Sequence, residues 1–202
     1  MALTIDELAV APRWPLEHTL ALTGRVRGDT LGAWGENLRE RFGQSALAKV
    51  RARLPPEHAQ IAPVLGDRDR VPVHAQLLIT EAIVDEFLDG NMPALLPLLV
   101  ADTRAGLGRI RLTAMRLAGV GYLMSLGPKT FRAVHEQGTH DAAVGKKSAH
   151  LYFTNNRLFA HPTWRVLQVL ATYVLFDLVG TDGKVLGHDA DTNAFTSIAT
   201  WT

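Results

Sequence analysis

Two kinds of hydrophobic spacing predict strands and a long helix in the last third of the chain. Polar and apolar residues alternate from 148 to 155, which is typical of a strand with one buried face. Residues 162–179 are apolar around most of a helical circumference, which predicts a helix buried on several sides. Two further short strands are predicted at residues 185–192 and 194–202. The order strand, helix, strand, strand places a natural pocket between the helix and the sheet.

The faces of these elements can be assigned from their spacing. Leu151 and Phe153 share one face of the first strand and are expected to pack on the 162–179 helix. His150, Tyr152 and Thr154 share the other face, where they either line a pocket or contact water. The helix residues expected to be mostly buried are Trp164, Leu167, Val174 and Leu178.

Upstream of residue 139, apolar residues recur three and four positions apart and predict a series of helices. Asp29 is a suitable N-cap for the first, and Gly43 suits a left-handed stop at its end. Gly106 and Gly108 are expected to interrupt a later helix that Pro93 opens. The predicted helices are 31–42, 45–54, 73–89, the interrupted helix from 93, 110–126, and the short helix from Pro128 through His135. Residues 57–70 and 139–147 are predicted as loops.

These elements together indicate a single α+β domain spanning residues 1–202. Residues 1–23 form an N-terminal arm that is extended or partly helical, residues 24–138 form a helical part, and residues 148–202 form the strand–helix–strand–strand part. We expect the helical two-thirds to pack on a small C-terminal antiparallel sheet of three or four strands, crossed by the 162–179 helix.

Composition adds limits on the class of protein. The 202 residues are 47% hydrophobic and 20% charged with a net charge of +1, which excludes a disordered chain and a polybasic nucleic-acid binder. The absence of cysteine excludes disulfides and thiolate chemistry. No signal peptide is recognisable, and the longest apolar run, 166–179, is too short for a membrane span. We expect a cytoplasmic protein with no nucleic-acid and no membrane partner.

Four short phrases carry a resemblance to a known family. They are Gly28-Asp-Thr-Leu, Leu38-Arg-Glu-Arg-Phe-Gly, Val50-Arg-Ala-Arg-Leu-Pro-Pro and Leu126-Gly-Pro-Lys-Thr-Phe. Over residues 24–202 the chain resembles the myxobacterial paralogous family of unknown function. That family is distantly similar to heme-nitric-oxide-binding (H-NOX) domains and to vinyl-reductase-type small-molecule-binding domains. The resemblance implies a helical part packed on a small antiparallel sheet, and it implies no established activity.

The distant similarity to H-NOX domains raises the question of heme. Those domains use a proximal histidine on a helix before the sheet and a Tyr-x-Ser-x-Arg motif that clamps the heme propionates. His135 lies at a comparable place, and Tyr152, Thr154 and Arg157 approximate the motif. Arg157 comes one residue late, which turns it to the other face of a strand unless a bulge intervenes. We therefore expect no cofactor, with heme possible but disfavoured.

Other candidate chemistry is explained more simply by structure. His140-Asp141 is similar to the metal-binding pair of His-Asp phosphohydrolases, but it falls in a predicted loop without partner ligands. His188, Asp189 and Asp191 offer metal-ligand types, but a polar, solvent-facing strand explains the whole segment without a metal. The sequence contains no nucleophile elbow and no phosphate-binding loop. We expect no metal site and no catalytic residues, and hence a protein that is not an enzyme.

The leading hypothesis is a non-catalytic regulatory or signalling module that binds a small apolar ligand between the central helix and the sheet. His135, Tyr152, Thr154 and Tyr173 are the predicted ligand-binding residues, because such sites combine apolar walls with a few polar groups. The alternatives are a ligand-free interaction or scaffold domain and a heme-based gas sensor. Because the 162–179 helix is apolar all round, we also predict a homodimer, or another protein partner, at this helix or at residues 95–100.

Overall fold

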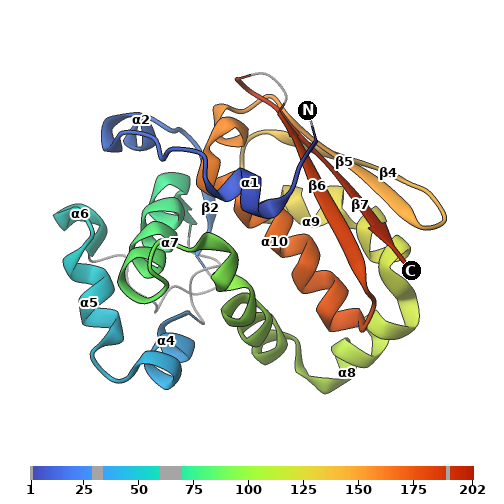
Figure 1. Cartoon of the computed structure of the whole chain (residues 1–202), viewed down its shortest axis with the longest axis horizontal. Coiled ribbons are helices and arrows are strands. Elements are labelled where there is room, and N and C mark those ends of the chain that lie inside the picture. The colour runs from blue at the N-terminus through green and yellow to red at the C-terminus, as the bar shows by residue number, and fades with distance from the viewer. Residues whose placement is uncertain (1, 29–33, 60–69, 190–191) are drawn as a thin grey trace.

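A five-stranded antiparallel sheet forms the C-terminal side of the molecule (Figure 1). The computed structural model describes residues 2–28, 34–59, 70–189 and 192–202. The strand order in the sheet is β1-β6-β7-β5-β4. The strands are β1 (Ala2–Leu3), β4 (Thr139–Val144), β5 (Ser148–Thr154), β6 (Gly183–Asp189) and β7 (Phe195–Trp201). The predicted α+β class and the three strands of the last third are confirmed.

The sheet differs from the prediction at both edges. Residues 139–144, predicted as part of a loop, form β4, which pairs along β5 from Thr139↔Thr154 to Val144↔Ala149. The arm supplies β1, where Ala2 pairs with His188 and Leu3 with Gly187. The sheet therefore has five strands rather than three or four, because two short segments with weak patterns of their own gain hydrogen bonds from a neighbouring strand.

The predicted long helix is α10 (Pro162–Val179), and its bounds follow from its end residues. Pro162 fits the first helical turn, and Gly180 ends the helix in the left-handed conformation with φ of +80°. Trp164, Val174 and Leu178 are buried as predicted, whereas Leu167 is only half-buried.

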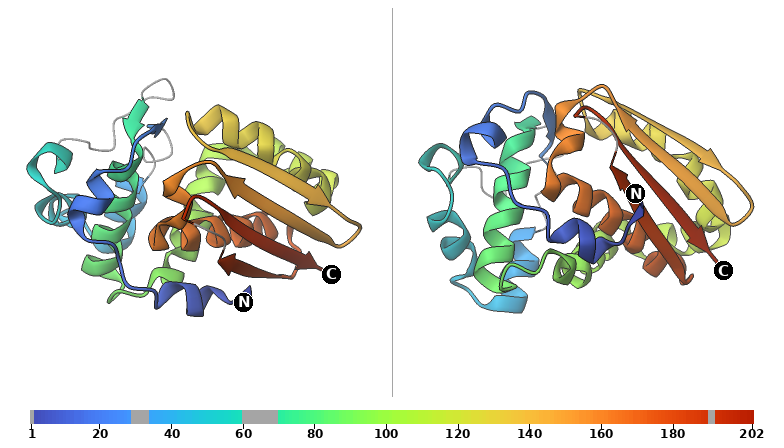
Figure 2. Two further views of the ribbon diagram at one scale, coloured as in Figure 1. Left: turned by 90° about the horizontal axis from the view of Figure 1, so that it is seen from above. Right: turned by 45° about the horizontal axis from the view of Figure 1, so that its top comes forward.

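Helix α10 lies between the sheet and α8 (Leu96–Ser125), as the views in Figures 1 and 2 show. The odd-numbered residues Ala149, Leu151 and Phe153 of β5 are buried on this side, while His150 and Tyr152 are exposed on the other. The Phe153 and Trp164 rings meet edge to face with their centres 5.0 Å apart. The expected packing of β5 on α10 is confirmed.

The helical part follows the predicted series with small shifts. Its regular elements are α4 (Trp34–Phe42), α5 (Ala46–Ala52), α6 (Pro56–Ala59), α7 (Val73–Phe87), η1 (Met92–Leu95), α8 and α9 (Gly127–Val134). Gly43 has the predicted left-handed φ, +90°, while Asp29 lies outside the described residues. An unpredicted two-stranded sheet joins β2 (Arg25–Arg27) to β3 (Arg70–Pro72). Between α9 and the sheet, His135 is the residue directly after the helix, in extended conformation.

Helix α8 is interrupted at Gly108 and Gly119, where the backbone has φ of +68° and +77°. The break at Gly108 was predicted, Gly106 stays helical, and the break at Gly119 was not predicted.

The arm folds into α1 (Ile5–Ala9) and α2 (Leu16–Leu20), and η2 (Arg157–Ala160) connects β5 to α10. Among the described residues, no helix combines the length and the apolar character needed to cross a membrane.

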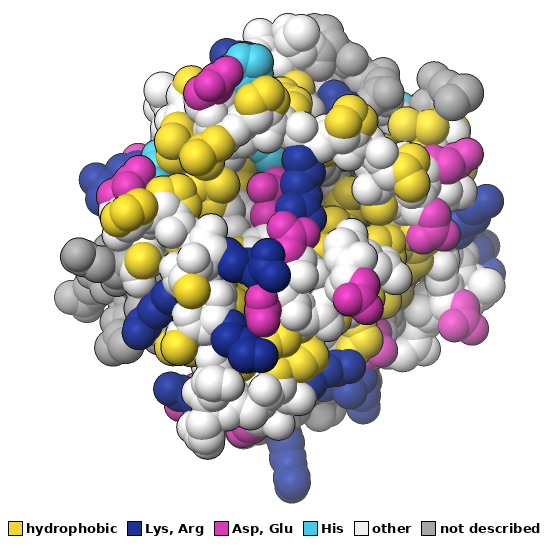
Figure 3. All heavy atoms as spheres, turned by 60° about the vertical axis from the view of Figure 1, so that its left-hand side comes forward, with side chains coloured by type: hydrophobic (Ala, Val, Ile, Leu, Met, Phe, Trp, Pro, Cys, Tyr) yellow, Lys and Arg dark blue, Asp and Glu magenta, His cyan; other side chains and the backbone are white. Residues whose placement is uncertain are grey.

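The face formed largely by the N-terminal helices carries mixed charges (Figure 3). Arg13 of the arm forms a two-pronged ion pair with Asp85 of α7, with both N–O distances 2.7 Å. Lys49 of α5 and Arg53, the residue after α5, pair with Glu86 of α7, at 3.6 and 2.7 Å. Because positive and negative side chains alternate over this face, it presents no extended field of one sign.

Candidate functional site: an apolar pocket and a polar groove

A pocket of about 390 Å³ lies between α8, α9, α10 and the strands β4 and β5. We call it the apolar pocket. Its walls are mostly Leu, Met, Val and Phe, and none of the described residues lining it is charged. Its volume falls in the range of small-molecule sites. The pocket therefore lies where the sequence predicted one, between the central helix and the sheet.

His140 is the polar group best placed to act in the apolar pocket. It stands on β4, its side chain is buried, and its ring stacks on Phe153 with the centres 4.3 Å apart. Its Nε2 atom is buried and has no hydrogen-bond partner among the described residues. Burial lowers the pKa of His140 to about 4, although Asp141 and the Gly127 backbone act in the opposite direction. The imidazole is therefore neutral near pH 7, with an uncommitted ring nitrogen.

Gly127 makes room for the His140 ring. A Cβ atom at position 127 would lie 2.8 Å from Cε1 of His140, which is closer than such atoms approach in proteins. The first residue of α9 must therefore be small if the ring is to keep its place. His140 is held by sequence-distant residues, from the α9 N-terminus on one side and from β5 on the other.

His135 is the one predicted ligand-binding residue that lines the apolar pocket. Its ring stacks on Phe131 with the centres 4.3 Å apart and the planes 14° from parallel. Burial lowers the pKa of His135 to about 4, and Arg70 and His140 add to this effect. The pocket thus contains two neutral imidazoles, and both contact Phe131, whose ring meets that of His140 edge to face with the centres 5.7 Å apart.

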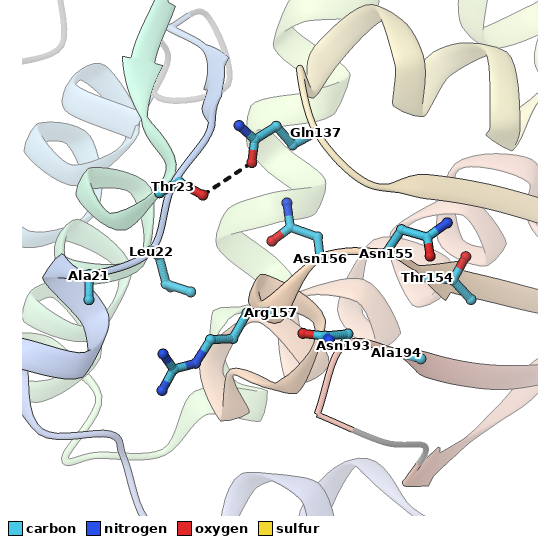
Figure 4. A pocket seen from close by; sticks show the side chains of 10 residues that line it. All are labelled: Ala21, Leu22, Thr23, Gln137, Thr154, Asn155, Asn156, Arg157, Asn193 and Ala194. Carbon is cyan, nitrogen blue, oxygen red and sulfur yellow. Dashed lines mark hydrogen bonds between the residues drawn. The ribbon is translucent and has the colours of Figure 1, made fainter.

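A second cavity, of about 650 Å³, opens between the arm and the ends of β5 and β7 (Figure 4). We call it the polar groove. Thr23 and Gln137 are joined across it by a hydrogen bond of 3.2 Å, and Asn155, Asn156 and Asn193 also line it. Most of its lining residues carry an amide or a hydroxyl group.

Thr154 and Arg157 line the polar groove and not the apolar pocket. The Thr154 hydroxyl lies 2.7 Å from that of Thr139, across the β4–β5 pair. Arg157 extends toward the arm, where its guanidinium lies 5.3 Å from the centre of the Trp14 ring. Asn155, with φ of +67°, redirects the chain between these two residues.

The two predicted tyrosines lie outside the linings of both cavities. Tyr152 is 39% exposed on the outer face of the sheet, beside His150. The hydroxyl of Tyr173 accepts a hydrogen bond of 3.2 Å from the backbone N–H of Val185. This bond satisfies a donor of β6, so Tyr173 stabilises the sheet at that point.

Sequence reasoning missed His140 because residues 139–147 looked like a polar loop. The signal that identifies it is the alternation of β4, in which His140 is buried and its neighbours Thr139 and Asp141 are exposed.

The structure cannot place His188, Asp189 and Asp191 together as a metal site, because Asp191 lies outside the described residues. Within the described part of the chain, no three His, Asp or Glu residues gather closely enough to hold a metal ion.

The residues that the H-NOX similarity suggested for heme do not meet in one cavity. His135 lines the apolar pocket, whereas Thr154 and Arg157 line the polar groove and Tyr152 faces outward. The apolar pocket does fit the other requirements of a heme site, since it offers a buried neutral imidazole and uncharged walls. The residues of the apolar pocket are therefore suited to the iron and to the apolar ring of a heme. They do not include a clamp for the heme propionates.

Comparison with solved structures reveals the same fold in H-NOX proteins. The Fe(II) unliganded H-NOX protein from K. algicida matches with a TM-score of 0.62 and 10% identity, over 87% of this chain and 96% of that one. A structure from work on heme distortion in the H-NOX family gives 0.60 and 9%, over 87% and 95%. An oxygen-binding H-NOX domain related to soluble guanylate cyclases, in its oxygen complex, gives 0.58 and 9%, over 87% and 95%.

These matches demonstrate a shared fold and a distant similarity to H-NOX domains. No protein-family model and no curated protein matches the sequence. The expectation of a cofactor-free domain is contradicted, because the solved structures with this fold come from Fe(II) and heme proteins. Heme was disfavoured from the sequence because Arg157 comes one residue late for the Tyr-x-Ser-x-Arg motif.

Proposed function

We propose that the chain is a heme-based gas-sensor domain that holds heme in the apolar pocket, with His140 as the axial ligand. The observation that carries the proposal is the buried Nε2 of His140, which lacks a hydrogen-bond partner among the described residues and lies in an uncharged pocket. Buried polar groups nearly always have partners, and an exception suggests a group that is missing from the site. The heme and oxygen-bound structures of the same fold support this choice of group.

The residues of this chain would act on the heme mainly by binding and by excluding water. The depressed pKa keeps the His140 imidazole neutral, which is the form that binds iron. Phe153 stacks on His140 and restricts the ring orientation. The largely apolar Leu, Met and Phe walls would favour a neutral gas over a charged ligand. When bound, heme would supply an iron atom that can bind a diatomic gas.

Heme titration of the purified protein tests the proposal. Hemin added to the wild-type protein is expected to bind with one-to-one stoichiometry and to shift its Soret band. The variant His140→Ala should lose the shifted band and His135→Ala should keep it, since the two substitutions remove the same side chain from the same pocket. Circular dichroism of both variants checks that the fold is intact. A band lost in His135→Ala and kept in His140→Ala would transfer the ligand role to His135.

Failure of the folded wild-type protein to take up hemin would exclude a heme sensor. The uncharged lining would then favour the second candidate function, a regulatory module for a small apolar organic ligand. Native mass spectrometry of freshly purified protein distinguishes that module from a ligand-free scaffold domain, because only the module is expected to carry a co-purified small molecule.

The homodimer also stays a prediction, which sedimentation of the purified protein tests. It was predicted because α10 is apolar all round, but α8 already covers much of α10 within one chain.

A further inference from the structure

The middle of α8, residues 109–118, forms a separate helical segment at the rim of the molecule (Figure 1). We call it the rim helix. It is bounded by Gly108 and Gly119, whose backbones are non-helical, and the Thr113 hydroxyl donates to the Arg109 carbonyl within it. Ten helical residues span about 15 Å. The breaks at both ends give this segment a direction of its own.

One face of the rim helix is packed and the opposite face is not. Leu112 and Met115 pack against the buried cluster of Val100, Val174 and Leu178. Ile110 and Leu117 point away, and their side chains are 88% and 84% exposed. Residues seven positions apart lie on the same side of a helix, so these two side chains form one apolar stripe.

Positive charge flanks this stripe. Between Asp102 and Glu136 the sequence contains six Lys and Arg residues and no Asp or Glu, although the whole chain has a net charge of only +1. Arg104 is paired with Asp177, and Arg116 donates to the carbonyl of Leu178. Arg109 and Arg111 are exposed at the beginning of the rim helix, on either side of Ile110.

The charge pattern selects the kind of partner. A second copy of the chain would bring one arginine-flanked stripe against another, which like charges oppose. A membrane surface requires a broader apolar face than two side chains provide. An amphipathic helix with acidic residues beside its apolar positions would match both the stripe and its flanks.

We propose that the rim helix is a docking surface for an acidic amphipathic helix of a protein partner. The apolar side chains Ile110 and Leu117 would supply the contact, and Arg109 and Arg111 would fix the orientation through their charges. This interface does not depend on heme or on any occupant of the apolar pocket.

A synthetic helical peptide of about three heptads, with Leu at the a and d positions and Glu at e and g, is the probe. Fluorescence anisotropy should detect its binding to the full chain, and binding should weaken with added salt. The double variant Ile110→Ser/Leu117→Ser is expected to weaken binding about tenfold or more. Arg109→Glu/Arg111→Glu should weaken it similarly and reduce the salt dependence. The matched control is Val10→Ser on the arm. It removes an apolar side chain that is 82% exposed and should leave peptide binding unchanged.

Equal binding of a scrambled peptide of the same composition would overturn the proposal, as would undiminished binding by both double variants. Vesicles of phosphatidylcholine with phosphatidylserine form the other arm of the experiment. Binding to these vesicles together with no binding of the peptide would replace the protein partner by a membrane surface. Equal thermal unfolding temperatures of the wild type and the variants would show that a change in binding comes from the altered surface and not from unfolding.

Discussion

The apolar pocket and the polar groove adjoin consecutive residues of β5, and they are built in different ways. Phe153 lines the pocket, while Thr154 lines the groove. The pocket is enclosed by α8, α9, α10 and the sheet, which also form the core. One wall of the groove is the arm, which is attached through side-chain contacts such as Arg13–Asp85 and Thr19–His161. The pocket should therefore be sensitive to substitution, and the groove tolerant.

The largest effect is expected from Phe153→Ala. The Phe153 ring is 2% exposed and lies next to the rings of Phe131, His140, Phe159 and Trp164. Truncation should lower the free energy of unfolding by about 3–5 kcal/mol, because it removes buried area and leaves a cavity. Urea unfolding measures the loss. Thr154→Ala is the matched control and should cost less than about 1 kcal/mol; similar losses in the two variants would refute the contrast.

An intermediate effect is expected from the titration of His161, which holds the arm beside the groove. Its side chain is fully buried, its Nε2 lies 3.1 Å from the Thr19 hydroxyl, and burial lowers its pKa to about 4. The unfolded chain binds this proton with a pKa near 6.5, so between pH 6.5 and 4 the unfolded state binds more protons. Stability is therefore complete above pH 6.5 and falls as the pH drops toward 4.

This dependence should be smaller in His161→Gln. Unfolding measured from pH 7 to pH 4 is expected to show a loss in the wild type that exceeds the loss in the variant by on the order of 2 kcal/mol. Hydrogen exchange should locate the change in α2 and the arm. Parallel pH profiles for the two proteins would mean that His161 is not responsible.

The smallest effect is expected from Arg13→Ala, which removes the ion pair between the arm and α7. The Arg13 and Asp85 side chains are 35% and 37% exposed, so solvent screens their attraction. The cost should be about 0.5 kcal/mol and should decrease further at high salt. A double-mutant cycle with Asp85→Ala measures the pairwise part. A coupling of several kcal/mol would mean that the arm is bound as firmly as the core.

The sequence predicted the elements whose signals are local. Pro162 and Gly180 mark the ends of α10, and the alternation around Leu151 defines β5. It failed where tertiary contacts decide the outcome. Strand β1 has two residues and exists through its pairing with β6. His140 is buried because Gly127 and Phe153 accommodate its ring, and neither residue is close to it in sequence.

The candidate site was predicted in position but only partly in its residues. A pocket between α10 and the sheet could be predicted because the apolar helix must pack against the strands. Small-molecule sites commonly form between such packed elements. His135 lines that pocket, whereas Tyr173 hydrogen-bonds the backbone of β6. Side-chain direction at the edge of a sheet depends on which backbone groups lack partners. That information arises only when all the strands are in place.

The two glycines that bound the rim helix are constrained by handedness rather than by space. Both combine a positive φ with ψ near 165°, a conformation that L-amino acids avoid. Apart from the adjoining backbone, no described residue lies within 4 Å of where a Cβ atom would stand at Gly108 or Gly119. The obstacle to a side chain at either position is therefore its chirality. The outward orientation of Ile110 and Leu117 depends on two achiral residues, and a mirror-image residue of D configuration would meet the same backbone without strain.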